Sequence, residues 1–216
     1  MKRLLSYIHP ITKYVDSRIN GKLEITWING KKNLDSKNTN YSYGSLQRIL
    51  NYGLSQINFS SITEILILGL GGGCVIKSLR DKFDYLGKIT AIEIDETVID
   101  IAQKEFNISN NKNLKIICDD ANSYIKNCQN QYDLIIIDLF IDTVVPSEFF
   151  SIEFWQMLIP LLEQEGYIIF NVGIDIEEDI RMKKIMEEFS HLLEFSEHKK
   201  VEGTNYMIIA KKNITV

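Results

Sequence analysis

Cysteine, histidine and proline are all scarce in this chain, with three of each among 216 residues. The cysteines, Cys74, Cys118 and Cys128, have neither CxxC nor Cys/His metal spacing, and their odd number does not indicate a disulfide framework. The histidines have no acidic or cysteine partner at metal-ligand spacing. We therefore expect no metal site, and ordinary packed cysteines in a reducing compartment, the cytoplasm.

Hydrophobic runs of membrane length are also missing, because none approaches the roughly 20 residues of a spanning helix. The first residues, MKRLLSYIHPITKY, are charged and then interrupted by Pro10, which is not the pattern of an export signal. The 24 basic residues are scattered among 29 acidic ones, for a net charge of -5, so no polyanion-binding surface is indicated. We expect a cytoplasmic protein with a small-molecule acceptor as partner, and neither nucleic acid nor membrane.

The chain divides near residue 40 into a small N-terminal part, 1–40, and a main domain, 41–216. Two Asn-Gly pairs, at 20–21 and 29–30, bracket the segment KLEITWI, in which hydrophobic residues alternate with polar ones. Asn-Gly between such runs is a strong hairpin signal and predicts a three-stranded antiparallel meander over about 11–35. A sheet this small is not stable alone, so its apolar face, Leu23, Ile25 and Trp27, packs on its own domain or on a second subunit. We expect a homodimer.

The main domain alternates between helical and strand patterns. Residues 41–57 have helical spacing, and short β-branched runs follow at 64–68, 88–94, 113–118, 133–138 and 166–172. Helical patterns separate them at 75–82, 97–106, 121–127 and 152–163, the last kinked at Pro160. Near-continuous apolar strands between helices predict an α/β fold, a doubly wound (Rossmann-like) and mainly parallel sheet. A C-terminal helix and hairpin, with strands in 193–200 and 205–212, adds a last antiparallel strand.

The first predicted strand runs directly into the glycine-rich segment LGLGGG. Gly69, Gly71 and Gly73 let the backbone turn tightly, approach a nucleoside and present N–H groups at a helix N-terminus. The dinucleotide fingerprint GxGxxG would need glycine at position 74, where this chain has Cys74. The segment therefore favours a nucleoside without a pyrophosphate, although a tight strand-to-helix connection would use the same residues.

Acidic residues end the second and third predicted strands. Glu93 stands about 20 residues beyond the glycines, where an acid typically binds ribose hydroxyls, and we assign it that role. Asp95 fits better as a cap of the next helix. Asp120, beside the small Ala121, is placed to accept from an adenine amino group, while Asp119 caps or faces water. Asp-Asp before a helix is also an ordinary capping signal.

Together these motifs resemble the spermidine synthase-like branch of the class I S-adenosylmethionine-dependent methyltransferase superfamily. The resemblance covers about 41–212 and rests on YSYGSLQRIL, LGLGGG, EIDETVIDIAQKEF, DDA and YDLIIIDLFIDTVVPSEFFSIEFWQML. It implies an enzyme that binds S-adenosylmethionine or its decarboxylated form. In polyamine synthases of this branch, the residue matching Asp138 activates the attacking amine and the residue matching Tyr43 helps to hold it. The N-terminal meander often contributes to a dimer.

Asp138 has a physical argument of its own beside the resemblance. In the family's strand order, the strand that ends at Asp138 lies beside the strand that ends at Gly69, which puts a carboxylate at the ligand crevice. The long apolar loop after it, LFIDTVVPSEFF, suits a lid that excludes water. A cap for the amides of this loop is the alternative role. We prefer the catalytic or substrate-orienting one.

Two departures from the family pattern decide the predicted reaction. The glycine loop of polyamine synthases carries an aspartate for the aminopropyl ammonium where this chain has Gly72, and a second carboxylate is replaced by Ile141. Asp142 or Glu148 would have to substitute. A backbone N–H at Gly72 favours the carboxylate of adenosylmethionine.

We therefore expect methyl transfer to a small acceptor, with aminopropyl transfer from decarboxylated adenosylmethionine as the alternative. Two further alternatives come from other classes of protein. A non-catalytic dimeric nucleoside-binding relative stays open, because the missing carboxylates fit lost chemistry. A nicotinamide oxidoreductase is disfavoured by Cys74 and by the C-terminal hairpin.

Overall fold

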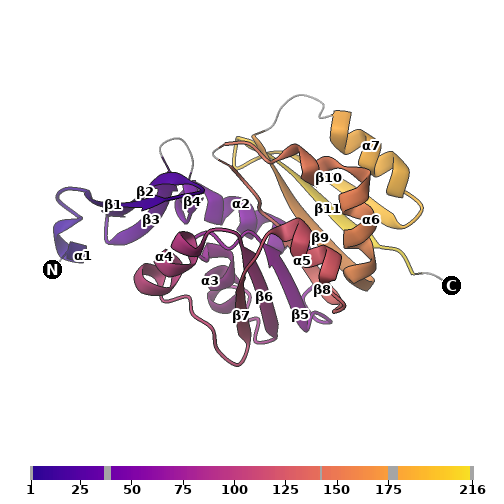
Figure 1. Cartoon of the computed structure of the whole chain (residues 1–216), viewed down its shortest axis with the longest axis horizontal. Coiled ribbons are helices and arrows are strands. Elements are labelled where there is room, and N and C mark those ends of the chain that lie inside the picture. Colours follow the sequence, from indigo (N-terminus) through magenta and orange to yellow (C-terminus); the bar gives the residue numbers. More distant parts are fainter. Residues whose placement is uncertain (1, 37–39, 142, 175–179, 215–216) are drawn as a thin grey trace.

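The computed structural model describes residues 2–36, 40–141, 143–174 and 180–214. In these residues the chain forms a small N-terminal sheet of four strands and a central sheet of seven strands with helices on both faces (Figure 1). The N-terminal sheet lies at one end of the central sheet, next to α2 and α4 in Figure 1.

The central sheet has the strand order β7-β6-β5-β8-β9-β11-β10. The first five strands along the chain pair in parallel, whereas β11 pairs antiparallel with both β9 and β10. This confirms the predicted doubly wound fold with its C-terminal antiparallel strand. Because the chain runs from β5 outward to β7 and then returns to β8, the winding direction reverses between β5 and β8. The strands are β5 (Glu64–Leu68), β6 (Lys88–Glu93), β7 (Leu114–Cys118), β8 (Tyr132–Ile137), β9 (Leu162–Ile174), β10 (Leu193–Val201) and β11 (Asn205–Lys212).

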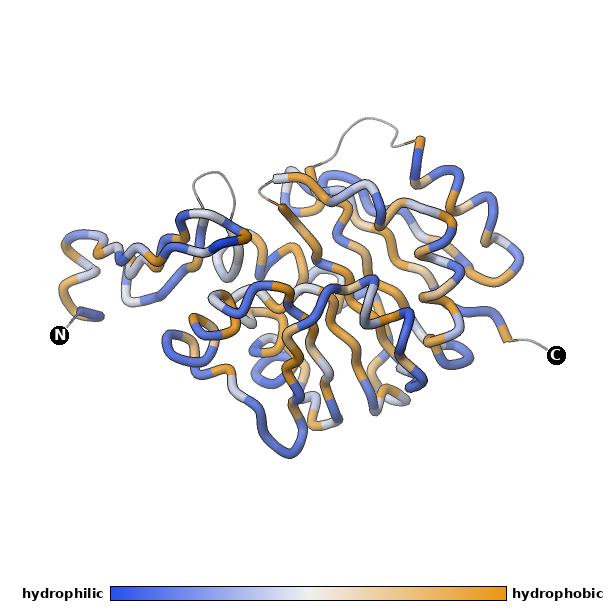
Figure 2. The backbone as a smooth tube through the Cα atoms, viewed as in Figure 1, coloured by the Kyte–Doolittle hydropathy of each residue, from blue (hydrophilic) through white to orange (hydrophobic). Residues whose placement is uncertain are grey.

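Six helices cover the two faces of this sheet. One face packs against α2 (Gly44–Ser55), α3 (Cys74–Asp81) and α4 (Glu96–Phe106), and the other against α5 (Ala121–Asn127), α6 (Ile152–Leu158) and α7 (Ile180–Phe189). Successive side chains of β5 alternate between the two cores, with Ile65 and Ile67 in the first and Leu66 and Leu68 in the second. Hydrophobic colour runs along the inner strands of the sheet in Figure 2, which are covered by helices on both faces and therefore read as apolar runs in the sequence.

The helix predicted over 152–163 is shorter than its sequence pattern indicated. Helix α6 ends at Leu158, a 3₁₀ turn, η2 (Ile159–Leu161), contains Pro160, and β9 starts at Leu162. Proline has no backbone N–H to continue the helix. Beyond the helix end, the backbone carbonyl groups of Ile159 and Leu162 accept from the ammonium group of Lys212, at the end of β11. Pro160 therefore ends the helix, and a contact from the far end of the chain holds the turn that follows.

The N-terminal sheet has one strand more than the predicted meander. It runs β1 (Ile11–Ser17), β2 (Gly21–Ile28), β3 (Lys31–Ser36) and β4 (Asn40–Ser42) in that order, so β4 extends past the predicted boundary at residue 40. The β2–β3 turn has positive φ at both Asn29 and Gly30, as its sequence predicted. The β1–β2 connection is a longer loop, 18–20, and only Gly21 has positive φ there. A one-turn helix, α1 (Lys2–Leu5), precedes this sheet.

The apolar face of the N-terminal sheet packs on its own domain. Leu23, Ile25 and Leu34 form a buried cluster with Val98 and Ile101 of α4. This is the alternative that the sequence left open. Two residues of the apolar face on which the expected homodimer rested, Leu23 and Ile25, are therefore covered by the chain itself, whereas Trp27 lies outside this cluster and is partly buried. The homodimer stays a prediction.

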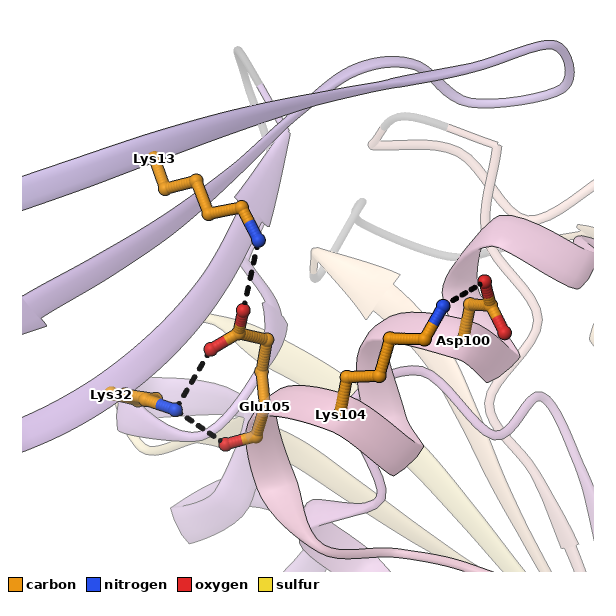
Figure 3. Close-up of polar contacts among 5 residues, drawn as sticks. All are labelled: Lys13, Lys32, Asp100, Lys104 and Glu105. Atoms are coloured by element: carbon orange, nitrogen blue, oxygen red, sulfur yellow. Dashed lines mark hydrogen bonds and ion pairs between the residues drawn. The ribbon is translucent and has the colours of Figure 1, made fainter.

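Polar contacts at the end of α4 also stabilise the interface between this helix and the N-terminal sheet. Glu105 accepts from Lys13 at 3.0 Å and from Lys32 at 2.9 Å, two lysines of different strands, and Lys32 also donates to the Glu105 backbone carbonyl at 2.7 Å (Figure 3). The hydrogen bond from Lys32 is the main reason that the pKa of Glu105 is lowered. The lysines of β1 and β3 thereby hold the sheet to the end of α4.

Asp95 fastens the opposite end of α4. It is the N-cap of the helix and accepts from the Thr97 backbone N–H at 2.9 Å. The second oxygen of its carboxylate accepts from the Asn20 side-chain amide at 2.6 Å and from the Ser17 hydroxyl. Asp95 is 3% exposed, so one buried carboxylate joins the β1–β2 loop to the helix N-terminus.

We expect Asp95→Ala to lower the free energy of unfolding by about 2 kcal/mol or more, because the substitution removes a cap and a buried acceptor. Asp100→Ala is the control on the same helix. Asp100 is exposed and pairs with Lys104 one turn away (Figure 3), an interaction worth about 0.3–0.5 kcal/mol. Urea unfolding measures both variants. Equal destabilisation would contradict this account of Asp95.

Candidate functional site

The glycine loop follows β5 at the point where the winding direction reverses. Gly69 has φ 95°, and a side chain there would collide with the Asp138 backbone carbonyl, which directly follows β8. The N–H of Asp138 donates to Leu68 at 2.9 Å, and that of Gly69 donates to Ile92 at 3.0 Å. Gly73, at φ 78°, is the N-cap of α3. The ends of three strands thus meet around a loop that only glycine can form.

A cavity opens beside this loop, at the carboxyl ends of β5, β6, β7 and β8. Most of the residues predicted to bind the nucleoside or to react lie in its wall: Gly69, Gly71, Glu93, Asp120, Ala121 and Asp138. Two further groups of wall residues come from the β1–β2 loop and from the segment after β8: Ile19, Asn20, Leu139, Phe140, Ile141, Pro146, Glu148 and Phe149. The rest of the wall comes from α2 and the ends of β6 and β7: Leu46, Ile92, Ile94 and Asp119. The N-terminal sheet therefore contributes directly to the site.

Glu93 holds the glycine loop from the end of β6. Its carboxylate accepts from the Gly71 N–H at 3.1 Å with one oxygen and from the Asp95 N–H at 3.1 Å with the other. The side chain is 9% exposed, and burial raises its pKa to about 7. A carboxylate that is costly to ionise stands where two strand ends and the loop converge, as is common in functional sites.

At the end of β7, the capping roles of two aspartates differ from the sequence assignment. Asp120 is the N-cap of α5 and accepts from the Ser123 N–H at 2.8 Å, whereas Asp119 accepts from the Asp120 N–H at 2.8 Å. Both line the cavity. Glu148 also lies at this end, where it accepts from the Asn122 amide at 3.0 Å.

Asp138 lies in the cavity wall directly after β8. One oxygen of its carboxylate accepts from the Asn171 side-chain amide at 2.8 Å. Burial raises the pKa of Asp138 to about 6, so the group is largely ionised at neutral pH. Sequence reasoning missed Asn171, although a lone asparagine inside the apolar run GYIIFNV was a usable signal.

A second cavity adjoins the first and was also missed. The two share Leu46 and Phe140 in their walls. The remaining lining comes from α2, from the segment after β8, from the end of β9 and from the C-terminal hairpin. It is largely neutral and polar: Ser45, Ile49, Thr143, Asn171, Gly173, Ile174, Thr204 and Asn205. Because Asp138 lines the first cavity and its partner Asn171 lines the second, the carboxylate lies where the two meet.

Tyr43 and Gly72 lie away from both cavities. The Tyr43 ring stacks on Phe106 with centroids 4.8 Å apart, and burial raises its pKa. The role that the resemblance implied for Tyr43 has no support in this geometry, because its ring packs against α4. A side chain at Gly72 would meet the fully buried Ser42, whose hydroxyl accepts from the Cys74 N–H at 3.2 Å.

Ile141, which stands where the second carboxylate of the family is missing, lines the first cavity and is 59% exposed. Two residues were considered as substitutes for the missing acids, Asp142 and Glu148, and only Glu148 can be placed. Asp142 lies outside the described residues. Among the residues that are described, no three His, Cys, Asp or Glu side chains lie close enough to hold a metal ion. No helix in the same residues is long and apolar enough to cross a membrane.

Residues 48–198 match the family model of the spermine/spermidine synthase domain. The chain belongs to this family. Among curated relatives, it is 29% identical over 138 residues to a polyamine aminopropyltransferase of Thermoplasma volcanium, which covers 62% of this chain and 48% of the relative. It is 32% identical over 119 residues to polyamine aminopropyltransferase 2 of Aquifex aeolicus, covering 51% and 24%. The chain thus matches about half or less of the length of these relatives.

Solved structures agree on the fold. Spermidine synthase from Thermotoga maritima matches with a TM-score of 0.66 at 19% identity, covering 94% of this chain and 73% of that one. Human methyltransferase-like protein 13, in complex with SAH, matches with a TM-score of 0.62 at 22% identity, covering 80% and 83%. The curated relatives are transferases named for aminopropyl transfer, so the preference for methyl transfer that Gly72 suggested is not supported by them.

The buried Glu93 makes stability depend on pH. Its pKa of about 7 lies above the ordinary 4.5, so between these pH values the folded state keeps a proton that the unfolded state has lost. The contribution of Glu93 to stability therefore falls as the pH rises through this window. Relative to Glu93→Gln, the wild-type protein should lose up to about 1.4 kcal/mol of unfolding free energy per pH unit there.

Urea unfolding at several pH values measures this difference. Glu96→Gln, an exposed neighbour at the start of α4, is the control and should leave the pH profile of the wild type unchanged. A difference between the wild-type protein and Glu93→Gln that stays constant across the window would contradict the burial argument.

Proposed function

We propose that the protein transfers an aminopropyl group from decarboxylated adenosylmethionine to a small amine. The observation that carries the proposal is the ionised Asp138 carboxylate between two adjoining cavities, at the strand ends of a spermine/spermidine synthase fold. The first cavity would take the nucleoside, and the second would take the acceptor amine. The names of the curated relatives favour this reaction over methyl transfer.

The wall of the first cavity has the chemistry that an adenine nucleoside needs. In this proposal the ribose hydroxyls donate to Glu93, whose carboxylate is already oriented by Gly71. The adenine amino group donates to Asp120, and the small Ala121 leaves room for the flat ring. Gly69 and Gly71 lie at the other end, beside Asp138, where the absence of side chains lets a ligand approach the backbone closely. Adenosylmethionine and its decarboxylated form have the same adenine and ribose, so these contacts do not distinguish the two ligands.

The reaction itself needs few groups. The nitrogen of the neutral amine attacks the propyl carbon bound to sulfur, the C–S bond breaks, and its electron pair goes to sulfur, which becomes a neutral thioether. The new C–N bond leaves a proton on nitrogen that passes through Asp138 to solvent. Asp138 thus holds the amine by a charge-assisted hydrogen bond and aims its lone pair. Phe140, in the walls of both cavities, helps to keep water from the sulfonium.

One observation favours methyl transfer as a second candidate. Gly72 offers no carboxylate for an ammonium tail, and Ser42 fills the space beside it, so an aspartate there would displace a buried hydrogen bond. Without that anion, the site does not compensate the loss of water around a ligand tail that carries only an ammonium. Under this candidate the acceptor and the role of Asp138 stay the same, and adenosylmethionine replaces the decarboxylated form.

Calorimetry with both nucleosides, followed by turnover with putrescine as the probe amine, decides between the candidates. We expect tighter binding of the decarboxylated form and release of methylthioadenosine. Asp138→Asn should lower turnover by about a hundredfold or more while it leaves nucleoside affinity within about threefold. Tighter binding of adenosylmethionine would favour methyl transfer. Failure to bind either sulfonium nucleoside would overturn both candidates and leave NAD as the ligand to test.

Glu93→Ala should weaken binding of the nucleoside by about 1.5–3 kcal/mol, the scale of hydrogen bonds to a charged group. In the wild-type protein the affinity should also decrease as the pH falls below about 7, because the protonated carboxyl accepts fewer hydrogen bonds. Glu96→Ala is the control, since this exposed side chain does not line the cavity. If Glu93→Ala is folded and binds as tightly as wild type, Glu93 is not a ribose ligand.

A further inference from the structure

Asn171 is a polar residue in the middle of an apolar strand. It follows YIIF in β9 and is 0% exposed. Burying an amide costs free energy unless its oxygen and nitrogen both find partners. The neighbouring strand residues Ile169 and Phe170 are buried hydrophobic side chains, so packing alone would be served by another apolar residue. The position therefore needs an explanation in terms of the hydrogen bonds that the amide makes.

The partners of Asn171 determine which way its amide faces. The oxygen of the Asn171 amide accepts from the Asn205 side-chain amide at 2.9 Å and from the Gly173 backbone N–H at 3.3 Å. Both of these groups are donors, so the oxygen must face them and the NH₂ group must face Asp138, to which it donates at 2.8 Å. Rotation of the amide by half a turn would break all three hydrogen bonds and set its oxygen against a carboxylate.

The orientation of Asn205 follows from that of Asn171. Because the Gly173 N–H can only donate, it fixes the Asn171 oxygen, and Asn205 must present its NH₂ group to that oxygen. The Asn205 oxygen then accepts from the Thr204 hydroxyl at 2.9 Å. Asn205 is 9% exposed and is the first residue of β11. Thr204, Asn205, Asn171 and Asp138 thus form a chain in which each hydrogen bond is donated in the direction of the carboxylate. Hydrogen bonds aligned in this way strengthen one another in a low-dielectric interior.

A β-bulge brings the two asparagines together. Tyr206 pairs with Gly173 and Met207 pairs with Asn171, so Val172 has no partner across the β9–β11 ladder. Gly173 has φ 104°, which turns its N–H toward the Asn171 oxygen. Bulges next to functional sites commonly re-aim side chains. Here the bulge sets Asn205 diagonally across from Asn171, within reach of its amide.

We propose that Asn205 is a positioning residue: through Asn171 it fixes the orientation of the Asp138 carboxylate at the junction of the two cavities. The role of Asp138 in catalysis rests on the proposed function, but the positioning itself does not. Asn171 holds one carboxylate oxygen, so that the other can take the acceptor amine. The C-terminal hairpin, 34 residues from Asn171 in sequence, then controls a group at the end of β8.

Few groups affect the pKa of Asp138, so this pKa can be used to test the role of Asn205. The hydrogen bond from Asn171 lowers the pKa of Asp138, against the larger effect of burial, which raises it. Cys74 is the titratable group whose charge would couple to Asp138, and burial raises its pKa to about 11, so it stays neutral across the range of interest. A change in the pKa of Asp138 then reports on the amide chain.

The experiment is a carbon NMR titration of the full chain labelled at aspartate carboxyl groups, with the Asp138 signal assigned by Asp138→Asn. Asn205→Leu removes the donor that locks Asn171, and should raise the pKa of Asp138 by about half a unit or more. Asn205→Asp should raise it by about one unit or more, because the new carboxylate draws the Asn171 NH₂ group away. Thr204→Val, at the outer end of the chain, should shift it by less than about 0.2 units.

The outcomes separate this inference from the proposed function. The titration needs no turnover, so it stands even if the protein transfers nothing. Where turnover is present, the acidic limb of its pH profile should move by the same amounts, which a merely structural role of Asn205 would not cause. A pKa unchanged in Asn205→Leu, with a shift in Asn205→Asp alone, would mean a simple charge effect and would overturn the inference. If Asn205→Leu does not fold, Asn205→Ser takes its place with the same expectation.

Discussion

The close approach of the ends of β5 and β8 is the constraint on which the rest of the structure depends. Gly69 has no side chain, and so the backbone that leaves β5 passes against the carbonyl of Asp138 as that residue leaves β8. These two strands are neighbours in the sheet only because the winding direction reverses between them. The crevice, the glycine loop and the Asp138 carboxylate all follow from this one contact.

The site holds two buried carboxyl groups that reduce the stability of the fold at neutral pH. Glu93 and Asp138 both have raised pKa values because burial removes water from their charged forms. Each carboxylate is nevertheless fixed by donors, backbone N–H groups for Glu93 and the Asn171 amide for Asp138. Such costly and well-oriented groups are what binding and catalysis require and what a stability-optimised core would leave out.

The N-terminal sheet is part of the site as well as a covering for α4. Ile19 and Asn20, in the β1–β2 loop, line the first cavity, and Asp95 joins this loop to the start of α4. The backbone N–H of Asp95 also donates to the Glu93 carboxylate. A ligand that orders the cavity therefore acts on the junction between the sheets. The fold alone does not decide the reaction, because proteins whose names give different reactions share it.

The sequence by itself determined the class of fold and part of the wall of the first cavity. Apolar periodicity located all five parallel strands and the C-terminal hairpin, and strand-end acids and glycines marked the crevice, because in a parallel sheet these ends meet at one edge. Only the tertiary structure decided which side chains pair across that edge. It joined Lys212 to the turn after α6, turned Tyr43 onto Phe106, buried Leu23 and Ile25 against α4, and joined Asn205 to Asn171 and Asp138. These contacts link residues far apart in sequence, and no local pattern of hydrophobicity or turn chemistry encodes them.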